Sequence, residues 1–246
     1  MTWFHCAEKR PSAAMRLICF PHAGGSAGFY RNWGKETTPA VEVHAVQYPG
    51  RANRIADPLV DDAEQLARLV AEAMNPLLDR PVALFGHSMG AVIAYEVGRI
   101  LQVRGCAPLH LFASGARSPH DRGDADRIAG KDDDDLVAAL AGYGGTDTKV
   151  LADPELRELV LPYVRNDFHL VESYRHRPKP RLTTPVSAII GAADPHVNHA
   201  QARRWAEVTD GRFTLTSLPG DHFYLVPQQA EVTAETLRRL NIPTVT

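Results

Sequence analysis

A serine flanked by two glycines constrains the fold of this chain most. Residues 82–93 read V-A-L-F-G-H-S-M-G-A-V-I, so Ser88 lies two residues from both Gly86 and Gly90, where an apolar run meets a helix-like segment. A serine pushed out of a strand-to-helix turn has strained backbone angles, and a Cβ two residues to either side would crowd the turn. The pattern therefore predicts a nucleophilic serine at the end of a strand.

Short apolar runs alternate with longer helical patterns along most of the chain. Such alternation favours a mostly parallel sheet flanked by helices, with its active site at the carboxyl ends of the strands. The length of 246 residues suits one α/β domain spanning residues 1–246. The predicted strands are residues 16–20, 41–48, 82–85, 109–113, 186–190 and 213–218, and the predicted helices are residues 62–78, 89–101, 198–208 and 230–240.

The alternation stops over residues 114–185, a length that requires structure of its own or a function. We expect a helical insertion at about residues 118–180 that acts as a lid. The charged run Lys131 to Asp135 predicts aspartates that cap a helix, and a metal site is the weaker alternative. Asp153-Pro154 predicts the start of a helix through about Asp167, in which Pro162 predicts a kink or break.

Composition excludes several function classes. The formal net charge of -2 gives no overall attraction to nucleic acid or an anionic membrane. No apolar run reaches the length of a membrane span, and the N-terminus lacks a signal-peptide pattern. Cys6, Cys19 and Cys106 are odd in number and lack metal-ligand spacing, which indicates reduced thiols. We expect a cytoplasmic protein with no nucleic-acid or membrane partner.

Activation of Ser88 needs a base within hydrogen-bond reach and a carboxylate that orients the base. Asp194 follows one predicted strand in G-A-A-D-P, and His222 follows the next in P-G-D-H-F. The order serine, aspartate, histidine is that of α/β-hydrolases, so we expect this fold. Asp121 is a rival carboxylate, because some hydrolases place the acid one strand earlier. Asp221 adjoins the histidine, and adjacent side chains are poorly placed to pair.

The tetrahedral intermediate of acyl transfer needs backbone N–H donors for its oxyanion. The amide of Met89, directly after the serine at a helix N-terminus, is one candidate. The amide of Ala23 is the other, because it lies in the glycine-rich stretch F-P-H-A-G-G-S-A-G after the first predicted strand. A glycine-rich turn without a ligand is the alternative, and a phosphate-binding loop is disfavoured because its motifs are missing.

Taken in order, P-H-A-G-G, Y-P-G-R, G-H-S-M-G-A, G-x-x-D-P and G-D-H-F closely resemble type II thioesterases of polyketide and nonribosomal peptide synthesis. The insertion segments L-P-Y-V-R-N-D-F and V-E-S-Y extend the resemblance. It implies Ser88 as nucleophile, Asp194 as orienting acid in preference to Asp121, His222 as base, and Ala23 and Met89 as oxyanion donors. Two departures, at Gln47-Tyr48 and at Ala52, are expected to bear on the pocket wall.

The resemblance also implies a substrate: an acyl group held as a thioester on the phosphopantetheine arm of an acyl or peptidyl carrier protein, where hydrolysis removes aberrant or stalled groups. No cofactor or metal is implied, and we expect a monomer. The rival functions are an acyl-CoA or small-ester hydrolase, a product-releasing thioesterase and a non-catalytic partner of a synthase.

One basic cluster comprises Arg175, His176, Arg177, Lys179 and Arg181. Because carrier proteins of this kind are usually acidic, we expect the cluster to contribute to docking or to contact the phosphate of the arm. A solvated basic linker is the alternative.

Overall fold

The computed structural model describes residues 2–121, 127–143, 151, 153–178 and 180–243. Its strands form one sheet in the order β1-β3-β2-β4-β5-β6-β7, in which only the pair β1 and β3 is antiparallel. The strands are β1 (Phe4–His5), β2 (Met15–Phe20), β3 (Val41–Val46), β4 (Val82–His87), β5 (Leu111–Ser114), β6 (Val186–Gly191) and β7 (Phe213–Leu218). The six predicted strands are confirmed to within two residues at each end, and the two-residue edge strand β1 was too short to give a pattern.

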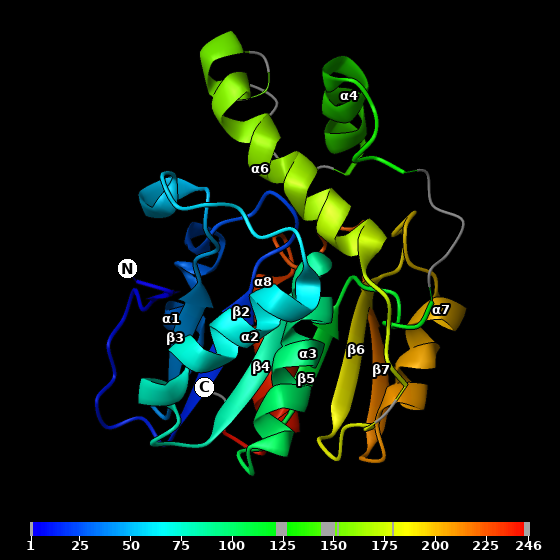
Figure 1. Cartoon of the computed structure of the whole chain (residues 1–246). Coiled ribbons are helices and arrows are strands. Elements are labelled where there is room, and N and C mark those ends of the chain that lie inside the picture. Colours follow the sequence, from blue (N-terminus) through cyan, green and yellow to red (C-terminus); the bar gives the residue numbers. More distant parts are fainter. Residues whose placement is uncertain (1, 122–126, 144–150, 152, 179, 244–246) are drawn as a thin grey trace.

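Helices cover both faces of this sheet (Figure 1). Residues of α2, α3 and α7 pack into one hydrophobic cluster, whereas residues of α1 and α8 pack into a second cluster on the opposite face. The helices are α1 (Trp33–Glu36), α2 (Ala63–Ala73), α3 (Met89–Val103), α4 (Asp133–Tyr143), α6 (Pro154–Ser173), α7 (His199–Arg203) and α8 (Gln229–Arg239). The arrangement confirms the predicted doubly covered sheet.

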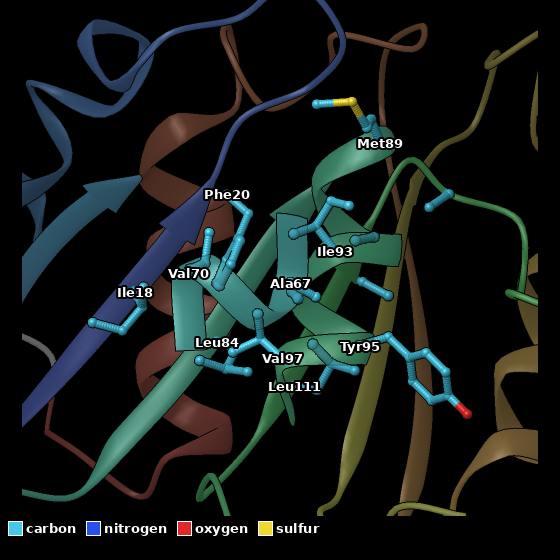
Figure 2. Close-up of a cluster of buried hydrophobic side chains, with 14 of the residues drawn as sticks. Ile18, Phe20, Ala67, Val70, Leu84, Met89, Ile93, Tyr95, Val97 and Leu111 are labelled. Atoms are coloured by element: carbon cyan, nitrogen blue, oxygen red, sulfur yellow. The ribbon is translucent and has the colours of Figure 1, made fainter. Parts of the chain in front are cut away.

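Strand β2 illustrates why the sheet has two cores. Ile18 and Phe20 face one cluster, and Leu17 and Cys19 face the other. Figure 2 shows Ile18 and Phe20 directed toward the cluster that contains Val70 of α2. Because successive side chains of a strand alternate between faces, a strand covered on both sides must be apolar throughout.

Two of the predicted helices are shorter than expected. Residues 62–78, predicted as one helix, form α2 followed by a 3-10 turn over Asn75–Leu77. The side chain of Asp62 caps α2 by accepting a hydrogen bond from Gln65 N at 2.6 Å. The turn contains a proline, which cannot continue the α-helical hydrogen-bond ladder. The pattern at residues 198–208 is likewise α7 followed by the 3-10 segment Arg204–Val208.

Between β5 and β6 lie α4 and α6, and α6 crosses above the carboxyl ends of the strands (Figure 1). Asp132 caps α4 by accepting a hydrogen bond from Asp135 N at 2.9 Å, as predicted for this acidic run. Asp153 caps α6. Pro162 does not break this helix, and the prediction that the helix ends near Asp167 is wrong, because α6 continues to Ser173; a kink at Pro162 stays a prediction. Its buried face of Leu161, Val164 and Leu170 supplies packing that offsets the hydrogen bond lost at proline.

Within the described residues, no helix combines the length and apolar character that a bilayer crossing requires.

Candidate active site

Ser88 lies at the turn between β4 and α3 with a φ of 53° and a ψ of -119°. This positive φ is strained for a residue with a side chain. A Cβ on Gly86 would lie 2.2 Å from the carbonyl oxygen of Gly90, and a Cβ on Gly90 would lie 2.0 Å from that of Phe20. Gly86 therefore allows α3 to approach β4 closely, and Gly90 allows it to approach the end of β2, which together hold the serine at the turn.

His222 and Asp194 meet beyond the ends of β7 and β6. The Nδ1 atom of His222 lies 2.9 Å from Oδ2 of Asp194, and both side chains are almost completely buried. The other oxygen of Asp194 accepts hydrogen bonds from the backbone N–H groups of His196, at 2.8 Å, and Val197, at 3.3 Å. With Nδ1 engaged by the carboxylate, Nε2 is the ring nitrogen left to exchange a proton with a substrate or nucleophile.

The rival carboxylates are engaged elsewhere. Asp121 lines the same cavity as Ser88, and its Oδ2 faces Arg204 Nη1 at 3.6 Å. Asp221 accepts a hydrogen bond from the backbone N–H of Phe223 at 2.9 Å, which closes a local turn. Asp194 is thus the carboxylate that the structure places on Nδ1 of His222.

Ser88 and His222 open into one cavity of about 560 Å³, a size suited to a small organic ligand. Ala23 and Met89 also line it. The insertion forms a further part of the wall, through residues that include Leu140, Tyr143, Phe168, Val171, Glu172 and Tyr174. The five residues expected to form the site therefore lie in or directly behind the wall of one cavity that the insertion helps to enclose.

The glycine-rich stretch after β2 forms a tight turn beside Ser88. The N–H of Gly25 donates to the carbonyl of His22 at 2.9 Å, and Gly24 has a φ of 77°, which favours glycine. The N–H of Gly24 donates to Asp167 of α6 at 2.8 Å. An insertion side chain therefore contacts the loop that carries Ala23.

Neutral histidines surround His222. Burial lowers the pKa of His22 to about 3, with His222 and Arg51 acting in the same direction. Burial, His222 and His22 hold the pKa of His87 well below its ordinary value, and the ring centroids of His87 and His222 are 5.1 Å apart. Both side chains are therefore uncharged at neutral pH and place no positive charge beside His222.

Sequence analysis missed the buried ion pair between Arg51 and Asp167. Arg51 follows β3, Asp167 lies on α6, and each is 2% exposed. The motifs Y-P-G-R and R-N-D-F contain them, but 116 residues separate the two positions, and no local pattern links them.

The expectation that Gln47, Tyr48 and Ala52 bear on the pocket wall is wrong, because none of them lines the cavity that contains Ser88. Gln47 Oε1 instead accepts a hydrogen bond from Ala27 N at 3.2 Å, and the Tyr48 hydroxyl donates to the Pro21 carbonyl at 3.3 Å. These side chains support the glycine-rich loop.

Much of the basic cluster is paired. Arg177 contacts Glu64 at 2.9 Å, and Arg181 contacts Asp210 at 3.2 Å. Arg175 is exposed and lines the cavity, while Lys179 lies outside the described residues. That the cluster contributes to docking of a carrier protein stays a prediction, and Arg175 is the residue best placed for this role.

With this geometry in view, comparison with known proteins decides the family. The Thioesterase domain family matches residues 15–240. This chain belongs to the thioesterase family. It is accordingly an α/β-hydrolase and an acyl-thioester hydrolase of the serine-hydrolase type.

Individual relatives agree with this assignment. The chain is 41% identical to thioesterase PikA5 of Streptomyces venezuelae over 94% of its own length and 82% of that protein. It is 39% identical to a probable cadicidin biosynthesis thioesterase of Streptomyces griseus over 97% of its own length, but it spans 65% of that relative. The solved structure of the type II thioesterase BorB, from the borrelidin biosynthetic cluster, has a TM-score of 0.88 and 34% identity and covers 100% of this chain and 99% of that one. The resemblance to type II thioesterases is thus confirmed.

Proposed function

We propose that this thioesterase removes acyl groups from the phosphopantetheine arm of carrier proteins in a polyketide or nonribosomal peptide synthase, with Ser88 as nucleophile, His222 as base and Asp194 as the orienting acid. The observation that carries the proposal is that the strained Ser88 and the buried Asp194–His222 pair open into one cavity. Strain at a single residue with a buried acid–base pair beside it is typical of a catalytic site.

Each proposed role follows from proton balance. As the Ser88 oxygen attacks the thioester carbonyl, Nε2 of His222 takes the hydroxyl proton, and the negative Asp194 stabilises the imidazolium. Collapse of the tetrahedral intermediate breaks the carbon–sulfur bond, and His222 returns the proton to the departing pantetheine sulfur. A water molecule then attacks the acyl-serine ester by the same exchange, which releases the acid and restores Ser88.

The amides of Ala23 and Met89 are the proposed oxyanion donors. Met89 is the first residue of α3, where backbone N–H groups have no partner within the helix and the helix dipole favours negative charge. Ala23 lies in the same cavity on the glycine-rich turn. Fixed donors of this kind commonly supply one of the largest contributions to catalysis.

Apolar and aromatic insertion side chains in the cavity wall, among them Leu140, Phe168 and Val171, support a lid over an acyl pocket within a single domain of residues 1–246, with the insertion at about 118–180. A cavity of about 560 Å³ has room for a small or medium acyl group and the end of the arm. The relatives named for PikA5, cadicidin and borrelidin biosynthesis support a carrier-protein substrate. Free Cys19 and Cys106 suit a reducing, cytoplasmic location.

Hydrolysis of one acyl group, attached either to a carrier protein or to coenzyme A, tests the proposal. We expect kcat/KM to be higher for the carrier protein, because its surface adds contacts that coenzyme A lacks. Ser88→Ala and His222→Ala should each lower kcat by roughly 10⁴-fold or more and abolish labelling of the protein by a fluorophosphonate.

The control is Asp121→Asn, which alters the rival carboxylate and should retain labelling. Loss of labelling in Asp121→Asn with retention in Asp194→Asn would reassign the acid. Equal kcat/KM on the two substrates would favour an acyl-CoA hydrolase, and unchanged turnover in Ser88→Ala would refute the proposed chemistry.

A further inference from the structure

Asp167 connects the insertion to the glycine-rich loop beside Ser88. Its Oδ2 accepts hydrogen bonds from the backbone N–H of Gly24, at 2.8 Å, and from Nη1 of Arg51, while its Oδ1 accepts one from Nη2 of Arg51 at 2.7 Å. Arg51 Nη1 also donates to the carbonyl of Gly25 at 3.2 Å. One carboxylate on α6 and the guanidinium paired with it therefore hold two consecutive residues directly after Ala23.

A second contact brings α6 against the same turn. A Cβ on Gly24 would lie 3.0 Å from Cγ2 of Val164, a fully buried residue one helical turn before Asp167. The glycine thus permits both the positive φ of the turn and the close seating of α6. The aromatic ring of Tyr163 lies over the Arg51 guanidinium at 4.7 Å and covers it from the α6 side.

We propose that Asp167, acting directly on Gly24 and through Arg51 on Gly25, is a positioning residue that sets the oxyanion loop in its working geometry only while α6 is seated. This inference rests on the proposed function, because it assumes that the amide of Ala23 receives the oxyanion. Asp167 and Arg51 do not line the cavity, so they act on the loop and not on the substrate.

The position of α6 is coupled to the position of the glycine-rich loop through the buried contacts of Asp167. If α6 lifts, Gly24 and Arg51 both lose the Asp167 carboxylate that accepts their hydrogen bonds, and the ring of Tyr163 no longer covers the guanidinium. The loop and α6 are therefore expected to move together. Because a donor displaced by about 1 Å can cost about 100-fold in rate, an unseated lid would leave Ser88 in place without an effective oxyanion hole.

The test compares Asp167→Asn with Asn166→Ala. Asn166 Nδ2 donates to the carbonyl of Val60 at 2.8 Å, so the control removes a neighbouring contact between α6 and the core that does not involve the loop. For Asp167→Asn we expect kcat on a small acyl thioester to fall by about 10- to 100-fold with KM changed less than about threefold. For Asn166→Ala we expect kcat to stay within about twofold of the unaltered enzyme.

Variants made in a Ser88→Cys background distinguish a displaced oxyanion loop from general damage to the active site. Alkylation of this thiol by iodoacetamide forms a sulfur–carbon bond, expels iodide and creates no oxyanion, so it reports the nucleophile and His222 alone. Asp167→Asn should leave this rate unchanged while it lowers thioester turnover in the Ser88 enzyme. An equal fall in both rates, or equal kcat values for Asp167→Asn and Asn166→Ala, would overturn the inference.

Thermal unfolding establishes that each variant is folded. If Asp167→Asn does not fold, Arg51→Lys tests the same link, because lysine keeps the charge but loses the paired donors, and the same selective fall in kcat is expected. If neither variant folds, the pair serves stability and the inference fails. Retained turnover in Ser88→Ala would instead refute the proposed function, whatever Asp167→Asn does.

Discussion

The two loops that flank the reacting position are held in place by different means. The nucleophile turn is fixed by close backbone packing, since Gly86 lets the start of α3 approach the end of β4 and Gly90 lets it approach the end of β2. The glycine-rich loop is held by a side chain 143 residues away, on a helix of the insertion. The first geometry is complete once β4 and α3 have packed against the adjacent strands of the sheet, whereas the second requires α6 to be packed in place.

The largest effect is expected at the nucleophile turn, where backbone atoms of α3 and β2 pack closely together. In Gly90→Ala the new Cβ would lie 2.0 Å from the carbonyl oxygen and 2.6 Å from the carbonyl carbon of Phe20, both backbone atoms that cannot rotate away. We expect the free energy of unfolding to fall by about 3 kcal/mol or more, measured by urea denaturation.

Gly98→Ala in the same helix is the matched control, because its Cβ would meet side chains at 3.6 Å, an ordinary contact distance. It should be neutral or slightly stabilising, since alanine favours helix. A Gly90→Ala protein as stable as Gly98→Ala would contradict the view that close approach at this glycine fixes the nucleophile turn.

The nucleophile turn could be predicted from the sequence. The strands were predicted because buried parallel strands are apolar throughout, and Ser88, Asp194 and His222 were located because each follows a strand within a short motif. Their proximity followed from topology, which gathers the carboxyl ends of parallel strands at one edge. Their catalytic roles remain a proposal that activity measurements must test.

The insertion could not be predicted to the same depth. Proline propensity favoured a kink or break at Pro162, but tertiary packing of Val164 and Leu170 lets α6 continue through this position. The pairing of Arg51 with Asp167 depends on how α6 is seated on the core, and nothing in either local motif specifies this. Long-range side-chain contacts are visible only after the fold places both partners.

The second-largest effect is expected from acid, which should lower the free energy of unfolding through buried histidines around the catalytic loops. His22, with its pKa lowered to about 3 mainly by burial, and His87, with its pKa held well below the ordinary value mainly by burial, stay uncharged when folded. Unfolding exposes both, and each then binds a proton below about pH 6.5. The unfolded state thus holds more protons, so stability is present above pH 6.5 and is lost as the pH falls.

For His22 the expected loss at about pH 5.5 is about 1.4 kcal/mol, measured by urea denaturation against about pH 7.5, and His87 adds to the loss in the same direction. Burial also lowers the pKa of His110 to about 4, and His110→Gln should remove a similar share of the pH dependence of the unfolding free energy. The exposed His199 supplies the control variant, His199→Asn. Unfolding free energies that are equal at the two pH values would contradict burial of neutral imidazoles in the folded protein.

The smallest effect tests whether the insertion unfolds together with the sheet. Gly142 lies in α4, and an added Cβ there would meet no atom of the described residues within 4 Å, so Gly142→Ala should raise stability by about 0.5 kcal/mol through helix propensity. Gly105, after α3, has equally open surroundings but a φ of 78°, so Gly105→Ala should lower stability by about 1 kcal/mol. If one urea transition shifts in opposite directions for the two variants, the insertion and sheet unfold as a unit, as the buried link through Asp167 requires. A separate early transition that responds to Gly142→Ala alone would show that α4 unfolds while the nucleophile turn stays intact. The insertion and the sheet would then not unfold as a unit.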